Sequence, residues 1–240
     1  MQQVRILFQD EDLVVFEKPA GVSVHPPEDP TLSRRGVDLI RILRTQTGRS
    51  VFPVHRLDRA TQGVMVMAFD GKTAGKIQSE FRSGGIEKSY LLMCRGWTSE
   101  DGVIEIPLES NPDVPDSPLQ EARTSYATLA QFELPIPCGR YPTSRFSLVE
   151  ARPGTGRFHQ IRRHFRKISH PLIGDSRHGD GRQNRLWREL LGESRLFLMA
   201  WSLGFRHPRT GDFMRFRSRF AKAWHPVFDR AGVCPISQRS

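Results

Sequence analysis

The chain has few cysteines and no long apolar run. Its three cysteines, Cys94, Cys138 and Cys234, lie far apart and form no C-x-x-C pair. An odd number at such spacing argues against a disulfide framework and against a zinc site. No stretch approaches the ~18 apolar residues of a membrane span, and residues 1–5 lack the pattern of a secretory signal. We therefore expect a cytoplasmic protein without a membrane segment.

Acidic residues are also scarce relative to basic ones. Lys and Arg together number 36 and Asp and Glu 26, which gives a formal net charge of +10. This excess suits a phosphate-bearing partner, although a generally basic soluble protein would have the same composition. At 240 residues the chain is long enough for one sizeable core. We expect a single domain over residues 1–240.

The pattern of apolar residues predicts a mixture of strands and helices. The helix predicted over 159–169 would turn Ile161, Phe165 and Ile168 to the core, because they recur at helical spacing. The absence of a regular β-α-β alternation favours an α+β fold. Proline-rich loops are expected at 25–36 and 107–118. Further helices are expected at 37–48 and 70–84, and strands at 4–8, 13–16, 64–69, 86–94, 123–132, 145–151, 196–199, 203–206 and 213–217.

One carboxylate stands among cations just before a predicted strand. Asp58 follows His55 and Arg56 and precedes Arg59. Neighbouring cations favour the ionised form of an acid, and an ionised carboxylate on a loop beside a rigid strand is a candidate nucleophile or base. On local sequence alone, a surface cluster of ion pairs is the simpler interpretation.

Five ordered motifs decide between these interpretations. Residues 55–63 (HRLDRATQG) resemble the motif H-R-L-D-x-x-T-S-G of the RluA-type pseudouridine synthases, and residues 88–90 (KSY) resemble that family's K-x-Y element. Residues 156–162 (GRFHQIR), 170–175 (HPLIGD) and 17–21 (EKPAG) resemble three further family motifs. The likeness spans about residues 5–217. The chain departs from the usual motif residues at Glu17, Gln62 and Phe158. These departures affect hydrogen bonding in the loop and packing around the cleft, and they leave the assignment of Asp58 unchanged.

The resemblance implies a fold, a reaction and three catalytic residues. The fold would be a mixed, mostly antiparallel central sheet with flanking helices and a central active-site cleft. Asp58 would supply the essential carboxylate, Tyr90 would stack under the uracil, and Arg162 would pair with Asp58. The alternative for Tyr90 is a tyrosine of the core. The alternative for Arg162 is a solvated arginine on a basic helix face, a role that suits Arg163, Arg166 and Lys167 better. No cofactor is implied, and the spacing of His170, His178 and His207 fits no common metal site.

The substrate implied is a folded RNA. Arg56 would fill the space of an extruded base, and His55 would support the loop or contact RNA. Residues 139–145 and 174–185 most resemble family members that modify uridine 65 of tRNA, so tRNA is the expected partner and no obligatory protein partner is inferred. Alternatives are a ribosomal RNA substrate and a non-catalytic RNA-binding or chaperone module. The predicted RNA-binding residues are His55, Arg56, Arg157, His159, Gln160, Arg177, Arg182 and Arg185.

Overall fold

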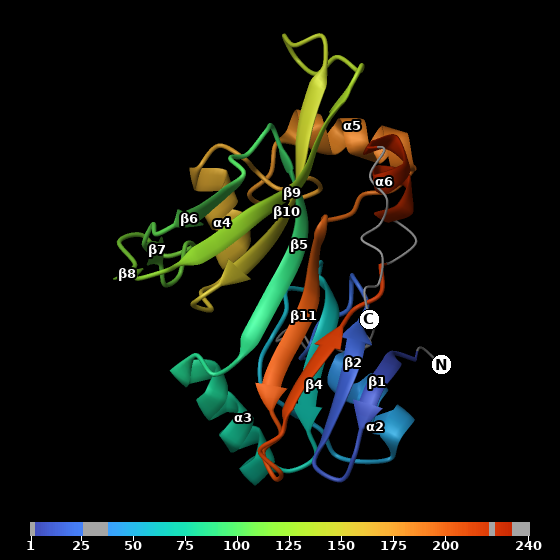
Figure 1. Cartoon of the computed structure of the whole chain (residues 1–240), viewed down its shortest axis with the longest axis vertical. Coiled ribbons are helices and arrows are strands. Elements are labelled where there is room, and N and C mark those ends of the chain that lie inside the picture. The colour runs from blue at the N-terminus through green and yellow to red at the C-terminus, as the bar shows by residue number, and fades with distance from the viewer. Residues whose placement is uncertain (1–2, 26–37, 221–223, 232–240) are drawn as a thin grey trace. The chain divides into compact units, whose positions relative to one another are not determined.

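A computed structural model describes residues 3–25, 38–220 and 224–231 (Figure 1). The loop expected at 25–36 lies almost wholly outside these residues. The chain divides into two compact units: unit 1 comprises Met1–Ser89 and Met199–Ser218, and unit 2 comprises Tyr90–Leu198 and Arg219–Ser240. The division falls inside two strands, β5 (Glu87–Arg95) and β11 (Leu198–Arg206). None of the helices in the described ranges is long and apolar enough to cross a membrane.

Unit 1 is built on strands in the order β1-β2-β4-β11, with β12 paired to β11 and β3 paired to β4. Every pairing is antiparallel except that of β11 with β4, where Met199 lies opposite Gln62. The bounds are β1 (Arg5–Gln9), β2 (Leu13–Lys18), β3 (Phe52–Pro53), β4 (Gln62–Ala68), β12 (Phe213–Arg217), α2 (Leu39–Thr47) and α3 (Gly71–Ser83).

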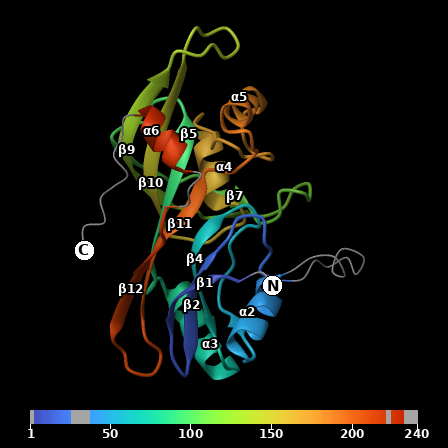
Figure 2. The same cartoon turned by 90° about the vertical axis from the view of Figure 1, so that its right-hand side faces the viewer.

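The core of unit 1 covers both faces of β2 and β4. Alternate residues, such as Val15 and Val66, pack with Ile77 of α3 in one hydrophobic cluster. The intervening Phe16 and Met65 are also fully buried. Helix α2 lies beside β1 in Figures 1 and 2. The Gln46 side chain of α2 exchanges two hydrogen bonds with the backbone of Val4, which precedes β1.

Unit 2 holds an antiparallel group of strands in the order β5-β10-β9-β6. Helix α4 contributes Ile161 and Phe165 to the hydrophobic cluster on this group. Trp187 of α5 makes an edge-on ring contact with Phe146 of β10. The bounds are β6 (Asp101–Ile104), β7 (Leu108–Glu109), β8 (Leu119–Gln120), β9 (Thr124–Leu134), β10 (Ser144–Pro153), α4 (Gln160–Lys167), α5 (Gly181–Leu191) and α6 (His225–Ala231).

Several expectations about the elements needed correction. The two strands expected at 196–199 and 203–206 form one continuous strand, β11. The segment 107–118, expected to be a plain loop, carries β7 and leads into β8, which pair with each other. Helices α5 and α6 were missed. Asp180 caps α5 by accepting hydrogen bonds from two backbone N–H groups, and Gly192 ends it in the left-handed conformation.

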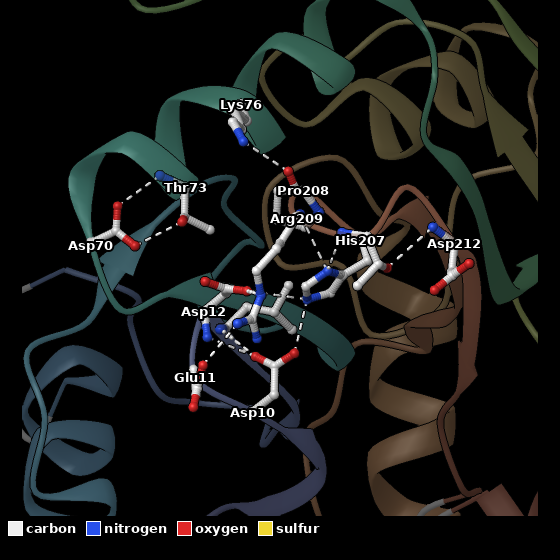
Figure 3. A network of polar contacts seen from close by, with 12 residues as sticks. Asp10, Glu11, Asp12, Asp70, Thr73, Lys76, His207, Pro208, Arg209 and Asp212 are labelled. Carbon is white, nitrogen blue, oxygen red and sulfur yellow. Dashed lines mark hydrogen bonds and ion pairs between the residues drawn. The ribbon is translucent and has the colours of Figure 1, made fainter.

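Polar side chains tie two turns of unit 1 together (Figure 3). His207, after β11, places Nε2 2.8 Å from Oδ2 of Asp10, after β1. The Nδ1 atom of His207 accepts hydrogen bonds from the backbone N–H groups of Arg209 and Thr210, so Nε2 carries the proton. Arg209 also pairs with Asp12 at 2.7 Å. These contacts hold the β1–β2 turn against the β11–β12 turn.

Candidate functional site

Asp58 begins a tight turn that is anchored to the residues after β2. The turn is closed by a 3.0 Å hydrogen bond from the Thr61 N–H to the Asp58 carbonyl. Gly21 donates its N–H to the Arg59 carbonyl at 2.8 Å, and the Arg59 side chain donates back to the Gly21 carbonyl at 2.9 Å. The motif at 17–21 therefore holds the motif that carries Asp58.

Lys18 forms the centre of this anchor and was not singled out from the sequence. Its Nζ donates to the carbonyl oxygens of Pro19, Arg59 and Thr61 at 2.9, 3.0 and 2.7 Å. Burial lowers the pKa of Lys18 to about 7, and the negative charge of Asp58 opposes that shift. Lys18 thus supports the Asp58 turn by hydrogen bonds and attracts its carboxylate. Its place in the K-P pair of the motif at 17–21 was the signal that could have identified it.

His55 is held by β4 and by α3. Its Nε2 accepts the backbone N–H of Val66 at 3.2 Å, and its ring stacks on Phe81 with a centroid separation of 4.7 Å. Burial, with a smaller contribution from Lys88, lowers the pKa of His55 to about 3, so the ring is neutral. These contacts favour loop support over RNA contact for His55. Arg56, beside it, has an exposed side chain.

Tyr90 lies on β5 opposite Ala151 of β10. Its ring is partly buried and packs against the cluster that contains Ile161 and Phe165 of α4. Tyr90 therefore lies on the side of the strands that α4 covers. The strand position expected from the sequence is confirmed.

Arg162 of α4 is buried and makes a two-pronged pair with Asp175. Both guanidinium contacts, from Nε and from Nη2, measure 2.7 Å. Asp175 is 1 % exposed, and its Oδ1 also accepts the backbone N–H groups of Arg177 and His178 at 2.9 Å. Burial raises the pKa of Asp175, but the hydrogen bonds and charge of Arg162 and those backbone donors lower it overall. Asp175, from the motif at 170–175, therefore fixes the Arg162 guanidinium in a set orientation.

Gln160 holds the loop that leads into α4. Its oxygen accepts from the Thr155 hydroxyl at 2.6 Å and from the Arg157 N–H at 2.9 Å, and its amide nitrogen donates to the Arg123 carbonyl and the Thr124 hydroxyl. The side chain is 5 % exposed. We therefore assign Gln160 to loop support. Arg157 is partly exposed and donates to the Glu121 carbonyl at 3.0 Å.

His159 stands at the start of α4 in the left-handed conformation, with φ +51° and no side-chain capping bond. Its ring stacks on Phe158 at 3.8 Å, and its Nδ1 lies 3.0 Å from Nε2 of His178. Arg177 lies over the Phe158 ring at 5.5 Å and pairs with Asp113.

The other cations of this part of the chain differ in exposure. Arg163, expected to be solvated, is 5 % exposed and pairs with Glu109 of β7, because the β7–β8 ribbon covers it. Arg182 and Arg185, expected to lie on a basic loop, stand on α5 with exposed side chains.

The three side chains predicted to be catalytic are divided between the two units. Asp58 belongs to unit 1, and Tyr90 and Arg162 belong to unit 2. Within the described residues, the one group with metal-ligand spacing is Asp10, Asp12 and His207. The Nε2 proton of His207 and the guanidinium of Arg209 occupy that group, so we interpret it as a structural lock.

The fold matches that of known proteins. Two solved human structures share the fold, each with a TM-score of 0.70. RNA Pseudouridylate Synthase Domain Containing 1 is 22% identical and matches 91% of this chain and 84% of its own. RNA Pseudouridylate Synthase Domain Containing 4 is 25% identical and matches 95% of this chain and 93% of its own. The expected α+β fold of the pseudouridine synthases is confirmed.

The sequence comparisons then place the chain in a family. Residues 12–167 match the family described as RNA pseudouridylate synthase. The chain is 39% identical over 237 residues to tRNA pseudouridine synthase C of Vibrio cholerae, covering 95% of this chain and 96% of that protein. The chain belongs to the RNA pseudouridylate synthase family.

Proposed function

We propose that this protein converts uridine to pseudouridine in tRNA, at position 65. Its similarity along nearly its whole length to proteins named tRNA pseudouridine synthase C supports tRNA as the substrate. The resemblance of residues 139–145 and 174–185 to members that modify uridine 65 supports the position. The observation that carries the reaction is the Asp58 turn, which Lys18 anchors through three backbone carbonyls.

The reaction rearranges one nucleotide without a change of oxidation state. The C1′–N1 glycosidic bond breaks, the freed uracil turns, C5 bonds to C1′, and the C5 proton is lost while N1 gains one. Asp58 supplies the carboxylate, Tyr90 presents an aromatic face to the uracil, and Arg162 orients the carboxylate. Asp175 sets the orientation of Arg162.

The RNA contacts divide by exposure. Arg56 is exposed beside Asp58 and is suited to fill the space left by an extruded base. Arg182 and Arg185 are exposed on α5 and are suited to phosphate contacts. The whole chain acts as one catalytic domain in this proposal.

The direct test is release of tritium from tRNA labelled at C5 of uridine. Wild-type protein is expected to release label from tRNA to water. Asp58→Asn, which keeps the shape but not the charge, is expected to release none while binding tRNA with nearly unchanged affinity. Asp101→Asn, at an exposed acid on β6, is the matched control and is expected to behave as wild type. Substantial turnover by the Asp58 variant would refute the assigned role.

The same assay separates the alternatives. Mapping pseudouridine in the product by chemical derivatisation and reverse transcription is expected to mark position 65. Release of label from ribosomal RNA alone would show that ribosomal RNA, and not tRNA, is the substrate. Tight tRNA binding by the wild-type protein with no release from any RNA would support a non-catalytic RNA-binding module.

A further inference from the structure

The most exposed aromatic side chain among the described residues is Tyr141, at 58%. It lies in the loop between β9 and β10, which extends beyond α5 in Figures 1 and 2. We propose that this hairpin tip, residues 138–141, binds an unpaired nucleotide of the RNA substrate away from the target uridine. The inference rests on the proposed function, because it names a second contact with the same RNA.

The tip is a closed turn rather than a loose loop. Cys138 and Tyr141 pair through two backbone hydrogen bonds of 3.1 and 3.4 Å, which leaves Gly139 and Arg140 as the turn residues. Gly139 has φ +66°, and a Cβ there would lie 2.8 Å from Nη1 of Arg182. Glycine therefore allows the turn to lie against the first turn of α5. A ring presented on such a turn loses little conformational entropy when a ligand stacks on it.

Two arginines lie at the tip, Arg140 beside the Tyr141 ring and Arg182 beside Gly139. Arg140 donates to the Tyr141 hydroxyl at 2.9 Å, and its guanidinium lies 5.1 Å from the ring centroid. Among the described residues, no carboxylate lies within ion-pair distance of Arg140, Arg182 or Arg185. The nearby Asp180 is already paired with Arg95 at 2.6 Å. An aromatic face beside unneutralised arginines suits a base and its phosphates.

The other exposed aromatic side chains that have an arginine beside them differ in charge. Phe213 has Arg215 at 5.5 Å, but Arg215 pairs with Glu87. Trp97 has Arg145 at 4.2 Å, but Arg145 pairs with Glu133. Among the exposed rings of the described residues that have an arginine beside them, the ring at the tip is the one whose arginine has no carboxylate partner. This combination favours a polyanion over a neutral protein surface.

The tip lies at the far end of the hairpin from α4. Thr124, the first residue of β9, is hydrogen-bonded to Gln160 of α4, and Leu134 ends the strand. At about 3.3 Å per residue, the strand separates these ends by roughly 30 Å. A nucleotide at Tyr141 is therefore distant from one held beside Arg162, and an RNA must be long to reach both.

This separation defines the experiment. The probes are an unmodified tRNA transcript and a short stem-loop cut from it that keeps the target uridine. For Tyr141→Ala in the full-length protein, we expect the Kd for the transcript to rise about fivefold or more, since base stacking is lost. The ratio of kcat/KM for the transcript to kcat/KM for the stem-loop is expected to fall by a similar factor. Tyr141→Phe is expected to restore both values, because stacking does not require the hydroxyl.

Phe213→Ala is the matched control, because it removes an exposed ring beside a neutralised arginine, and it is expected to leave the ratio unchanged. For Arg140→Ala we expect the slope of log Kd against log salt to fall by about one. The inference is overturned if Tyr141→Ala leaves the Kd for the transcript unchanged, or if it lowers kcat/KM equally for both RNAs. Loss of binding to a protein with no change in binding to the transcript would also overturn it. If wild type releases no tritium from either RNA, the proposed reaction fails, while the binding measurement still decides the contact at Tyr141.

Discussion

At the residue scale, the buried pair between Arg162 and Asp175 constrains the site most strongly. The two side chains are 7% and 0% exposed, so each depends on the other for its charge to be tolerated. The surface pair of Arg177 with Asp113 differs, because the Asp113 side chain is 66% exposed and water screens it. The buried pair therefore fixes the arginine proposed to be catalytic, whereas the surface pair contributes little to stability.

The Asp175→Asn variant is expected to lower kcat at least tenfold and to destabilise the fold by about 3 kcal/mol, because it leaves Arg162 buried without its counter-charge. Asp113→Asn should cost less than about 1 kcal/mol. Tritium release and urea unfolding of both variants would check this. Equal effects of the two substitutions would contradict the role given to Asp175.

His55 makes the stability of the fold sensitive to acid. Its folded pKa of about 3 lies below the unfolded value of 6.5, so between these pH values the unfolded chain binds the extra proton. Stability therefore decreases as pH falls from 6.5 towards 3. From pH 7 to pH 5 this group should remove on the order of 1–2 kcal/mol.

The His55→Gln variant keeps an acceptor for the Val66 N–H but does not titrate there. We expect it to lose less stability than wild type between pH 7 and pH 5, as measured by urea unfolding at each pH. His225→Gln, at an exposed histidine on α6, is the control and should follow the wild-type curve. An identical pH dependence of the His55 variant and wild type would show that the ring is protonated freely in the fold.

At the element scale, β4 and β11 approach so closely that only glycine fits at position 63. Gly63 has φ +123°, and a Cβ there would lie 2.1 Å from the Ala200 carbonyl oxygen. This contact sits two residues after Thr61, so it also fixes where the Asp58 turn joins the sheet. The glycine of the motif at 55–63 therefore has a packing reason, independent of the chemistry.

Gly63→Ala is expected to destabilise the protein by about 3 kcal/mol or more, or to prevent folding, since backbone must move to admit the methyl group. Gly71→Ala, at the start of α3 where a Cβ would meet nothing within 4 Å, is expected to be neutral or slightly stabilising. Urea midpoints or soluble yield would compare the two. Equal stability of both variants would show that β4 and β11 can separate at no cost.

At the scale of the whole molecule, the proposed reaction requires side chains of two units to meet. Asp58 belongs to unit 1, and Tyr90 and Arg162 belong to unit 2. Two strands, β5 and β11, run through the division and link the units covalently.

A cross-linking measurement tests this meeting. In a background of Cys138→Ser and Cys234→Ser, the pair Asp58→Cys and Tyr90→Cys is expected to react with one short bismaleimide. Cys94 can remain, because it is fully buried and burial raises the pKa of its thiol to about 12. The pair Tyr141→Cys and Tyr90→Cys is the control and should stay unlinked, because Tyr90 lies opposite Ala151 and β10 separates Ala151 from Ser144, near Tyr141, by roughly 20 Å. Failure of the first pair to link would place the carboxylate and the tyrosine apart and end the proposed mechanism.

Local pattern accounts for much of the fold. The expected helix at 159–169 corresponds to α4, because Ile161 and Phe165 recur at the helical period and face the cluster they were expected to face. Helix α5 was missed because its first turn contains Gly181 and Asn184, which have low helix propensity. Its stability comes from Trp187 packing on Phe146.

By itself, the sequence determined the order of the motifs, the charge, the periodic elements and the family, because these depend on residues close together along the chain or on their identity. Only the tertiary structure decided that Arg162 is bound by Asp175, that Lys18 donates to three carbonyls around the Asp58 turn, and that Arg163 is buried under β7. Those partners are separated by up to 54 positions. Their pairing follows from how the strands and helices pack, which the local pattern of residues does not specify.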